Sequence, residues 1–201
     1  MRKIYTSVEL GSYSIKIVVC EIINNNFHVL ASSNTRCKGI RNGVIVDHEL
    51  VKEYLLSGIK KVEDMLGFPI KEVIVGITSK EKTFDILSGE IEIDNEQRIV
   101  RDEEIEKAYQ DLVMGKIDGN EELLSIMPIS FQVDKSDLTK NPKGMVGDNL
   151  FLKGVIIKVP KNNLRPYLSL FKECGIMVTD ITLSSIGDYY EAKNSTFDTD
   201  V

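Results

Sequence analysis

The stretch from Ile4 to Ser32 reads IYTSVELGSYSIKIVVCEIINNNFHVLAS, and it decides the fold of the chain. Apolar residues alternate weakly from Ile4 to Leu10, and a run rich in Ile and Val follows from Ile15 to Ile23. Branched and aromatic side chains favour strands. The turn signal Asn24-Asn25-Asn26 leads into a third run, Phe27 to Ser32. The stretch therefore predicts three strands that form an antiparallel meander.

A helix and a fourth strand are predicted next. The segment GIRNGVIVD, from Gly39 to Asp47, has the glycines of a turn and leads into a short extended piece. Asp47 is a suitable N-cap for a helix that runs to about Leu66, and Gly67 is its C-cap. The apolar residues of this helix recur at helical spacing, so one face is expected to be buried: Val51, Tyr54, Leu55, Ile59, Val62, Met65 and Leu66. The run from Lys71 to Thr78 (KEVIVGIT) then predicts a buried strand, parallel to its neighbour because a helix crosses between them.

The middle of the chain has a different pattern. A strand is predicted from Lys82 to Asp94, with Phe84, Ile86, Ile91 and Ile93 at its apolar sites, and a helix from Asp102 to Lys116. Two further strands follow, Leu123 to Val133 and Leu150 to Pro160, joined by a polar loop that contains glycine. The order strand, helix, strand, strand indicates a small unit inserted into the surrounding domain.

The last part of the chain again has a helix followed by a strand, as in the part before the insert. A helix is predicted from Leu164 to Cys174, with Leu164, Leu168 and Phe171 on its buried face. A strand from Ile176 to Leu183 and a short helix from Ser184 to about Lys193 complete the chain. The fold class is therefore α/β (α+β), with an insert.

Composition excludes several classes of protein. The net charge of −6 argues against a nucleic-acid partner, which usually selects a basic surface. No run approaches the roughly 18 apolar residues of a membrane span, and the N-terminus lacks the apolar region of a signal peptide. The three cysteines, Cys20, Cys37 and Cys174, are widely spaced and form no C-x-x-C motif, so we expect reduced thiols in a cytoplasmic protein.

The stretch between the first two predicted strands has residues that could bind a phosphate and a metal ion. It places an acid, Glu9, beside Gly11 and the hydroxyl residues Ser12, Tyr13 and Ser14, and Lys16 follows. A tight turn here can direct backbone N–H groups at a phosphate, and an acid at the end of a strand can hold Mg²⁺ through water. These residues by themselves are more typical of a simple hairpin turn with polar side chains.

Sequence runs outside this stretch narrow the choice of protein family. The Glu9–Lys16 stretch resembles the first phosphate loop of the actin, sugar-kinase and Hsp70 superfamily. Five further runs, in order along nearly the whole chain, resemble FtsA, the actin-like family that links the bacterial division filament to the membrane. They are GIRNGVIVD at 39–47, GFPIKEVIVGI at 67–77, MPISFQVD at 127–134, NPKGMVG at 141–147 and ECGI at 173–176.

This resemblance implies an actin-like, ribonuclease-H-like domain, called 1A in the family. Domain 1A would comprise residues 1–78 and 161–201, and residues 79–160 would form the inserted strand-helix-strand-strand subdomain 1C. The second phosphate loop would begin just after Val201. The adenosine segment, the FtsZ-binding subdomain and the C-terminal membrane helix would also lie beyond that residue.

The resemblance also implies a nucleotide site. Glu9, Gly11, Ser12, Tyr13, Ser14 and Lys16 would contact ATP, and Glu9 would hold Mg²⁺ indirectly. The family often has a lysine where this chain has Ser14, and here the basic residue is displaced to Lys16. Each lost charge-assisted hydrogen bond costs roughly 1.5–3 kcal/mol. With one loop only, we expect this chain to bind ATP weakly or not at all and to have no ATPase activity.

The implied function is assembly and not catalysis. FtsA-like proteins polymerise, recruit FtsZ to the inner face of the cell membrane at the division septum, and contact other division proteins through subdomain 1C. FtsZ and the membrane would be engaged by regions beyond residue 201. Two alternatives remain: the actin-like platform protein of type IV pilus assembly, and a sugar-kinase-type enzyme, which would need a catalytic aspartate in a second half.

Overall fold

The computed structural model describes residues 3–24 and 26–188, and the chain divides into two compact units. The smaller unit is Glu81–Lys161, and the other is built from residues on both sides of it. These limits lie within two residues of the insert expected at 79–160. The predicted turn residue Asn25 and the predicted helix beyond residue 188 lie outside the described residues.

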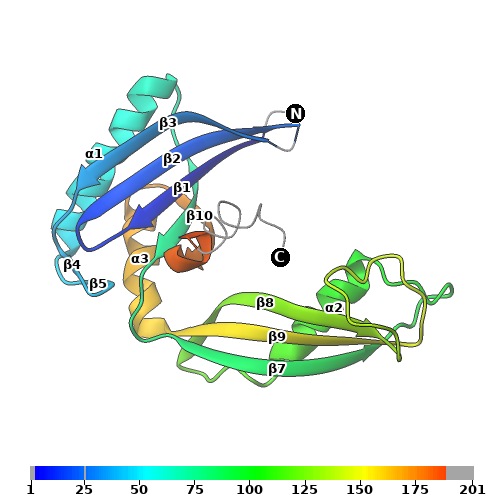
Figure 1. The fold of residues 1–201 in the computed structure, drawn as a ribbon. Helices are drawn as coiled ribbons and strands as arrows, with labels where there is room; N and C mark the ends of the chain where they lie inside the picture. Colours follow the sequence, from blue (N-terminus) through cyan, green and yellow to red (C-terminus); the bar gives the residue numbers. More distant parts are fainter. Residues whose placement is uncertain (1–2, 25, 189–201) are drawn as a thin grey trace, which may run out of the picture. The chain divides into compact units, whose positions relative to one another are not determined.

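The larger unit is built on a five-stranded sheet of order β10-β6-β1-β2-β3 (Figure 1). The strands β1 (Lys3–Leu10), β2 (Ser14–Ile23) and β3 (Asn26–Arg36) form the expected antiparallel meander. β6 (Glu72–Ile77) runs parallel to β1, and β10 (Met177–Leu183) runs parallel to β6. This mixed order confirms the predicted α/β fold class.

The helix α1 (His48–Leu66) covers one face of this sheet, over β2 and β3. Its predicted caps are confirmed: the side chain of Asp47 accepts from the backbone N–H of Leu50 at 3.1 Å, and Gly67 adopts the left-handed conformation at φ 76°. Met65, which the apolar spacing placed on the buried face, is 64% exposed. It lies in the last turn of the helix, whereas Val51, Leu55 and Val62 are buried as expected.

β3 continues four residues beyond the predicted end at Ser32. The prediction ended the strand there because Ser33 to Arg36 are mostly polar. In the structure the Ser33 hydroxyl donates to the carbonyl of Gly58 in α1 at 3.2 Å. A Cβ at Gly58 would lie 3.1 Å from Ile17, so the glycine lets the helix approach the sheet closely enough for this bond.

A two-residue turn, Asn42–Gly43, joins the short strands β4 (Ile40–Arg41) and β5 (Val44–Ile45). Both turn residues have positive φ, 54° and 75°, as a type I′ hairpin requires. A side chain on Gly43 would overlap the backbone carbonyl of Thr78, just after β6. The hydroxyl of Tyr167 donates to the Gly43 carbonyl at 2.9 Å, and burial raises the pKa of Tyr167 to about 12.

The helix α3 (Lys161–Glu173) begins three residues before the predicted start at Leu164. Its buried residues are Leu164, Tyr167, Leu170 and Phe171. The prediction that Leu168 lies on the buried face is wrong, since this side chain is 41% exposed. Tyr167 takes its place because the hydroxyl end of a long ring reaches the Asn42–Gly43 turn.

The inserted unit is a three-stranded antiparallel sheet of order β7-β9-β8 with one helix (Figure 1). Its elements are β7 (Thr83–Glu92), α2 (Asp102–Val113), β8 (Glu121–Val133) and β9 (Asn149–Pro160). Ile93, Leu112, Phe131, Leu150 and Ile156 belong to the core between sheet and helix. The chain order is the predicted strand, helix, strand, strand.

Two apolar residues of β7 lie on the face away from this core. Phe84 and Ile86 are 54% and 65% exposed, whereas Leu87 and Ile91 pack on the core. Phe84 and Ile86 therefore lie on the opposite face of the strand from Leu87 and Ile91. Even and odd positions of a strand point to opposite faces, and α2 passes over the odd-numbered Gly89, whose Cβ would lie 2.9 Å from Asp111.

α2 starts and ends for identifiable reasons. The carboxylate of Glu104 is buried, where it accepts from the Arg101 backbone N–H at 2.9 Å and from the Asn95 amide at 3.0 Å. The helix ends at Val113, three residues before the predicted Lys116. Met114 has an extended ψ of 120°, and Gly115 has a positive φ of 67°.

We predict that Tyr167→Phe lowers the free energy of unfolding by about 1–3 kcal/mol, the cost of a buried carbonyl that loses its donor. Urea denaturation followed by circular dichroism measures the change. Tyr5→Phe, on a partly exposed ring for which no hydrogen bond is present among the described residues, is the matched control, and we expect a change within about 0.5 kcal/mol. Equal changes in both variants would contradict the assigned role of the Tyr167–Gly43 bond.

A second prediction concerns Glu173, at the end of α3. It accepts from Lys52 at 3.0 Å, His48 at 3.1 Å and Ser169 at 3.1 Å, and the hydrogen bond from Lys52 is the main reason that the pKa of Glu173 is lowered. A lowered pKa stabilises the fold above the unfolded value of about 4.3, and that contribution is lost as the pH falls through the folded value.

Glu173→Gln should therefore be less stable than the wild type at pH 7, and the difference should vanish toward about pH 3. Thermal unfolding from pH 7 to pH 3 measures it. Asp64→Asn removes the exposed i,i+4 pair with Lys60 and serves as control, with a smaller difference expected. A difference for Glu173→Gln that does not change with pH would refute the ion-pair explanation.

Candidate functional site

The predicted phosphate-binding residues lie on the turn between β1 and β2. The Gly11 N–H donates to the Ser14 carbonyl at 3.1 Å, and a Cβ at Gly11 would lie 3.0 Å from that oxygen, so the turn favours glycine there. Tyr13 is held by its carbonyl, which accepts from the Cys37 N–H at 2.8 Å. Within the described part of the chain, the amides of Ser12 and Tyr13 donate no hydrogen bond. Successive free amides of a turn can bind an anion.

Glu9 and Lys16 face each other one step below this turn. They are direct partners in the β1–β2 register, and their side chains form an ion pair at 2.9 Å. The hydrogen bond to Glu9 is the main reason that the pKa of Lys16 is raised, and the charge of Asp188 adds to it. Lys16 therefore neutralises the acid that was predicted to hold Mg²⁺.

Tyr13 is 67% exposed. Its hydroxyl accepts from an Arg36 nitrogen at 2.9 Å, and the Arg36 guanidinium carbon lies 5.1 Å from the ring centre. This arrangement brings a second cation to the turn. Sequence reasoning missed Arg36, because this residue lies in the polar part of β3 beyond the predicted end of the strand at Ser32.

Ser184 also lies at this edge of the sheet. Leu10 and Leu183 are both in register with Ile77, so the carboxyl ends of three neighbouring strands, β1, β6 and β10, meet here. A Cβ at Gly76 would lie 3.0 Å from the Ser184 hydroxyl and 3.8 Å from Glu9 Cα. The hydroxyl is buried and has no partner among the described residues. Ligands of α/β sheets bind at carboxyl ends of strands, and the position of Ser184 directly after the last strand is the signal that could have identified it.

The described residues do not favour a metal cluster or a reactive thiol. The described residues contain no cluster of three or more His, Cys, Asp or Glu side chains able to hold a metal ion. Burial raises the pKa of the Cys20, Cys37 and Cys174 thiols, which keeps them protonated and poorly nucleophilic. None of the helices in the described ranges is long and apolar enough to span a membrane.

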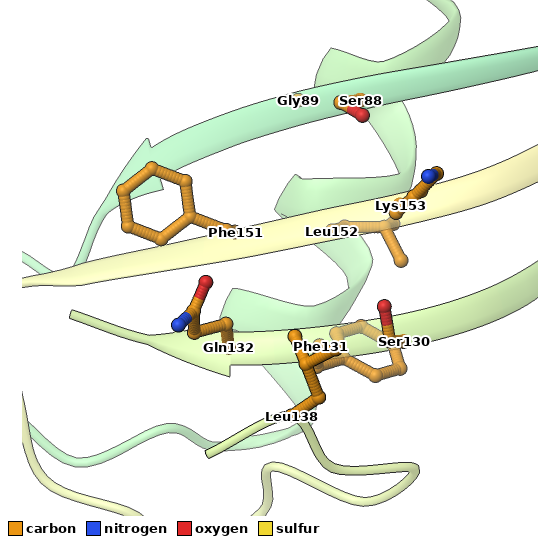
Figure 2. A pocket seen from close by; sticks show the side chains of 9 residues that line it. All are labelled: Ser88, Gly89, Ser130, Phe131, Gln132, Leu138, Phe151, Leu152 and Lys153. Carbon is orange, nitrogen blue, oxygen red and sulfur yellow. The ribbon is translucent and has the colours of Figure 1, made fainter. Parts of the chain in front are cut away.

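The inserted unit offers a separate candidate surface. A hollow of about 260 Å³ lies on its sheet, with α2 behind the strands in Figure 2. One row of side chains across the three strands consists of Ser88, Lys153 and Ser130. The next row contains Phe151 and Gln132, which lie directly opposite each other. The exposed Leu138 forms one rim. Among these side chains, the aromatic ring of Phe151 is of the kind that is enriched at protein interfaces.

A protein-family model matches most of the inserted unit. Residues 83–158 match the family model described as the SHS2 domain inserted in FtsA. The match starts at the first residue of β7 and ends two residues before the end of β9, so it covers the three-stranded sheet and α2.

Similarity extends over most of the chain. Cell division protein FtsA from Enterococcus hirae is 24% identical over 182 residues, which are 90% of this chain and 41% of that protein. FtsA from Bacillus subtilis is 24% identical over 92% of this chain and 42% of its own length. FtsA from Staphylococcus epidermidis is 28% identical over 88% of this chain and 38% of its own length. The chain thus spans about two-fifths of these curated relatives.

A solved structure supports the fold. The PilM-PilN type IV pilus biogenesis complex contains a chain that superimposes with a TM-score of 0.59 and 12% identity, over 95% of this chain and 50% of the other. At that identity the likeness concerns the fold alone. Residues 83–158 thus match the SHS2 domain inserted in FtsA, and the chain as a whole is similar to cell division protein FtsA over about nine-tenths of its length.

Proposed function

We propose that this chain is part of an actin-like assembly protein of the cell division machinery, which binds nucleotide and does not act as a classical enzyme. The observation that supports this most is the SHS2-type insert between β6 and α3, in a chain whose similarity to FtsA extends on both sides of it. The finer roles that follow are that the full-length gene product polymerises, links FtsZ filaments to the membrane at the division septum, and contacts other division proteins through the insert.

We further propose that the β1–β2 turn holds the phosphates of ATP. The amides of Ser12 and Tyr13 are free to donate to phosphate oxygens, and Gly11 shapes the turn. The Glu9 carboxylate would hold Mg²⁺ through water once Lys16 moves away from it, and Lys16 would then balance phosphate charge. Mg²⁺ supplies charge neutralisation of the phosphates. Because the described residues offer few other contacts to a nucleotide, we expect the 201-residue chain by itself to bind ATP weakly or not at all.

The nucleotide proposal is tested by calorimetric titration of ATP into the full-length gene product, with and without Mg²⁺. Glu9→Gln frees Lys16, so it should tighten ATP binding in the absence of Mg²⁺ and reduce the gain that Mg²⁺ provides. Lys16→Met should weaken ATP binding by about tenfold, the effect of one charge-assisted contact. Lys60→Met, on the exposed surface of α1, is the matched control and should change nothing. If Glu9→Gln and Lys16→Met both bind ATP like the wild type, the site is elsewhere.

A second candidate function is that of the actin-like platform of type IV pilus assembly. The superposition on a chain of the PilM-PilN complex over 95% of this chain favours it as an alternative. The similarity to FtsA is higher in sequence, 24–28% against 12% identity, and for that reason we place the division role first.

The two candidates make opposite predictions in a capture experiment. With the full-length gene product immobilised, we expect FtsZ from the same organism to be retained. A short cytoplasmic tail peptide of a pilus membrane protein should pass through. Retention of the tail and not of FtsZ would reverse the assignment.

A further inference from the structure

The two outer edges of the inserted sheet differ in how they are protected. β8 has two register shifts against β9, at Leu123/Ser125 and Pro128/Ser130, and Pro128 itself cannot donate to a neighbouring strand. The backbone of Phe131 exchanges both of its hydrogen bonds with Thr139, at 2.8 and 2.9 Å. The Lys140 ammonium also donates to the carbonyl of Ile129. Bulges, proline, a covering loop and lysine are the devices by which proteins prevent pairing at an edge.

The opposite edge, β7, has no bulge and no proline. Its ten residues, Thr83 to Glu92, pair one for one with β9 without a register shift, and none of them is proline. Outside that ladder, the backbone groups of Thr83–Glu92 make no hydrogen bond to any other residue that the structure describes. A long, regular strand with a free edge is a template for an added strand.

The side chains of β7 suggest which strand is added. Phe84 and Ile86 lie on the face away from α2 and are mostly exposed. The even-numbered positions share this face. Before Phe84 this series has the positively charged Lys82, and after Ile86 it has the negatively charged, exposed Glu90. A strand that is basic at its start and acidic at its end complements an antiparallel copy of itself.

We propose that β7 pairs with β7 of a second copy of this chain, antiparallel about a two-fold axis at Ile86. Directly opposed residues share a face, so Ile86 meets Ile86 of the partner subunit and Phe84 lies opposite Ser88 of the partner subunit. Lys82 lies opposite Glu90 of the partner subunit, and the symmetry repeats this charge pair. The two three-stranded sheets become one sheet of six strands.

The neighbouring registers are less favourable. An axis at Asp85 would place two carboxylates opposite each other, and an axis at Leu87 would place Phe84 opposite Glu90 of the partner subunit. Like charges directly opposite destabilise a strand pair, whereas apolar and opposite-charge pairs stabilise it. The pairing rests on the self-assembly part of the proposed function and names the surface and the partner for it.

Disulfide crosslinking tests the position of the axis. A cysteine at the axis faces its own copy, so Ile86→Cys in the 201-residue chain should yield a covalent dimer under mild oxidation, reversed by dithiothreitol. Met114→Cys is the matched control, because Met114 is 72% exposed in the same unit but lies in the turn after α2. The wild type, with Cys20, Cys37 and Cys174, gives the background. Equal dimer yields from the two variants would overturn the proposal.

Charge reversal tests the register independently of oxidation. Sedimentation equilibrium of the 201-residue chain should detect a reversible dimer. Lys82→Glu or Glu90→Lys should weaken the dimer by about tenfold, corresponding to roughly 1.4 kcal/mol. The double variant Lys82→Glu/Glu90→Lys should restore it, while unchanged circular dichroism shows that each variant is folded. A chain that stays monomeric at every concentration, or a double variant as weak as the single ones, overturns the pairing.

Sedimentation of the chain and FtsZ capture by the full-length gene product together distinguish a failure of the β7 pairing from a failure of the proposed function. If the chain is monomeric and the full-length gene product still retains FtsZ, only the β7 pairing is wrong. If FtsZ is not retained, the division role itself fails, whatever the state of the β7 edge.

Discussion

The close approach of the Gly43 backbone to Thr78 is the constraint on which the larger unit depends. It leaves no room for a side chain at Gly43, and it holds the Asn42–Gly43 turn against the point where β6 ends and the insert begins. Tyr167, which follows the insert in the chain, donates to the same glycine. Segments before, at and after the insertion point are thereby joined by backbone contact and one buried hydrogen bond. An 81-residue insertion can then leave the β10-β6-β1 register intact.

That register also positions the candidate site. Because β1, β6 and β10 are parallel, their carboxyl ends bring Glu9, Gly76 and Ser184 to one edge, beside the free amides of the β1–β2 turn. The Glu9–Lys16 ion pair holds the predicted acid and the predicted base in a mutually neutralised state. The candidate site is assembled by the order of the sheet, because only long connections join β1, β6 and β10 along the chain.

The inserted unit has its own core and its own asymmetry. α2 covers one face of its sheet, the 134–149 loop protects the β8 edge, and the face with Phe84 and Lys153 and the β7 edge are left for contact. An unprotected edge strand promotes aggregation in a protein that functions as a monomer. In a protein that assembles, the same edge is a specific contact, and its charge order determines the partner.

The sequence by itself determined the elements, the antiparallel meander, both caps of α1 and the existence of an insert, because these depend on local periodicity and on capping and turn residues. Of the six predicted site residues, four lie together on the turn, while Glu9 and Lys16 pair with each other. Only the tertiary structure decided that Phe84, Ile86, Met65 and Leu168 are exposed and that Arg36 and Ser184 lie near the turn. A period of two or 3.6 residues defines faces without saying which face another element covers, and contacts between distant strands follow from the order of the sheet.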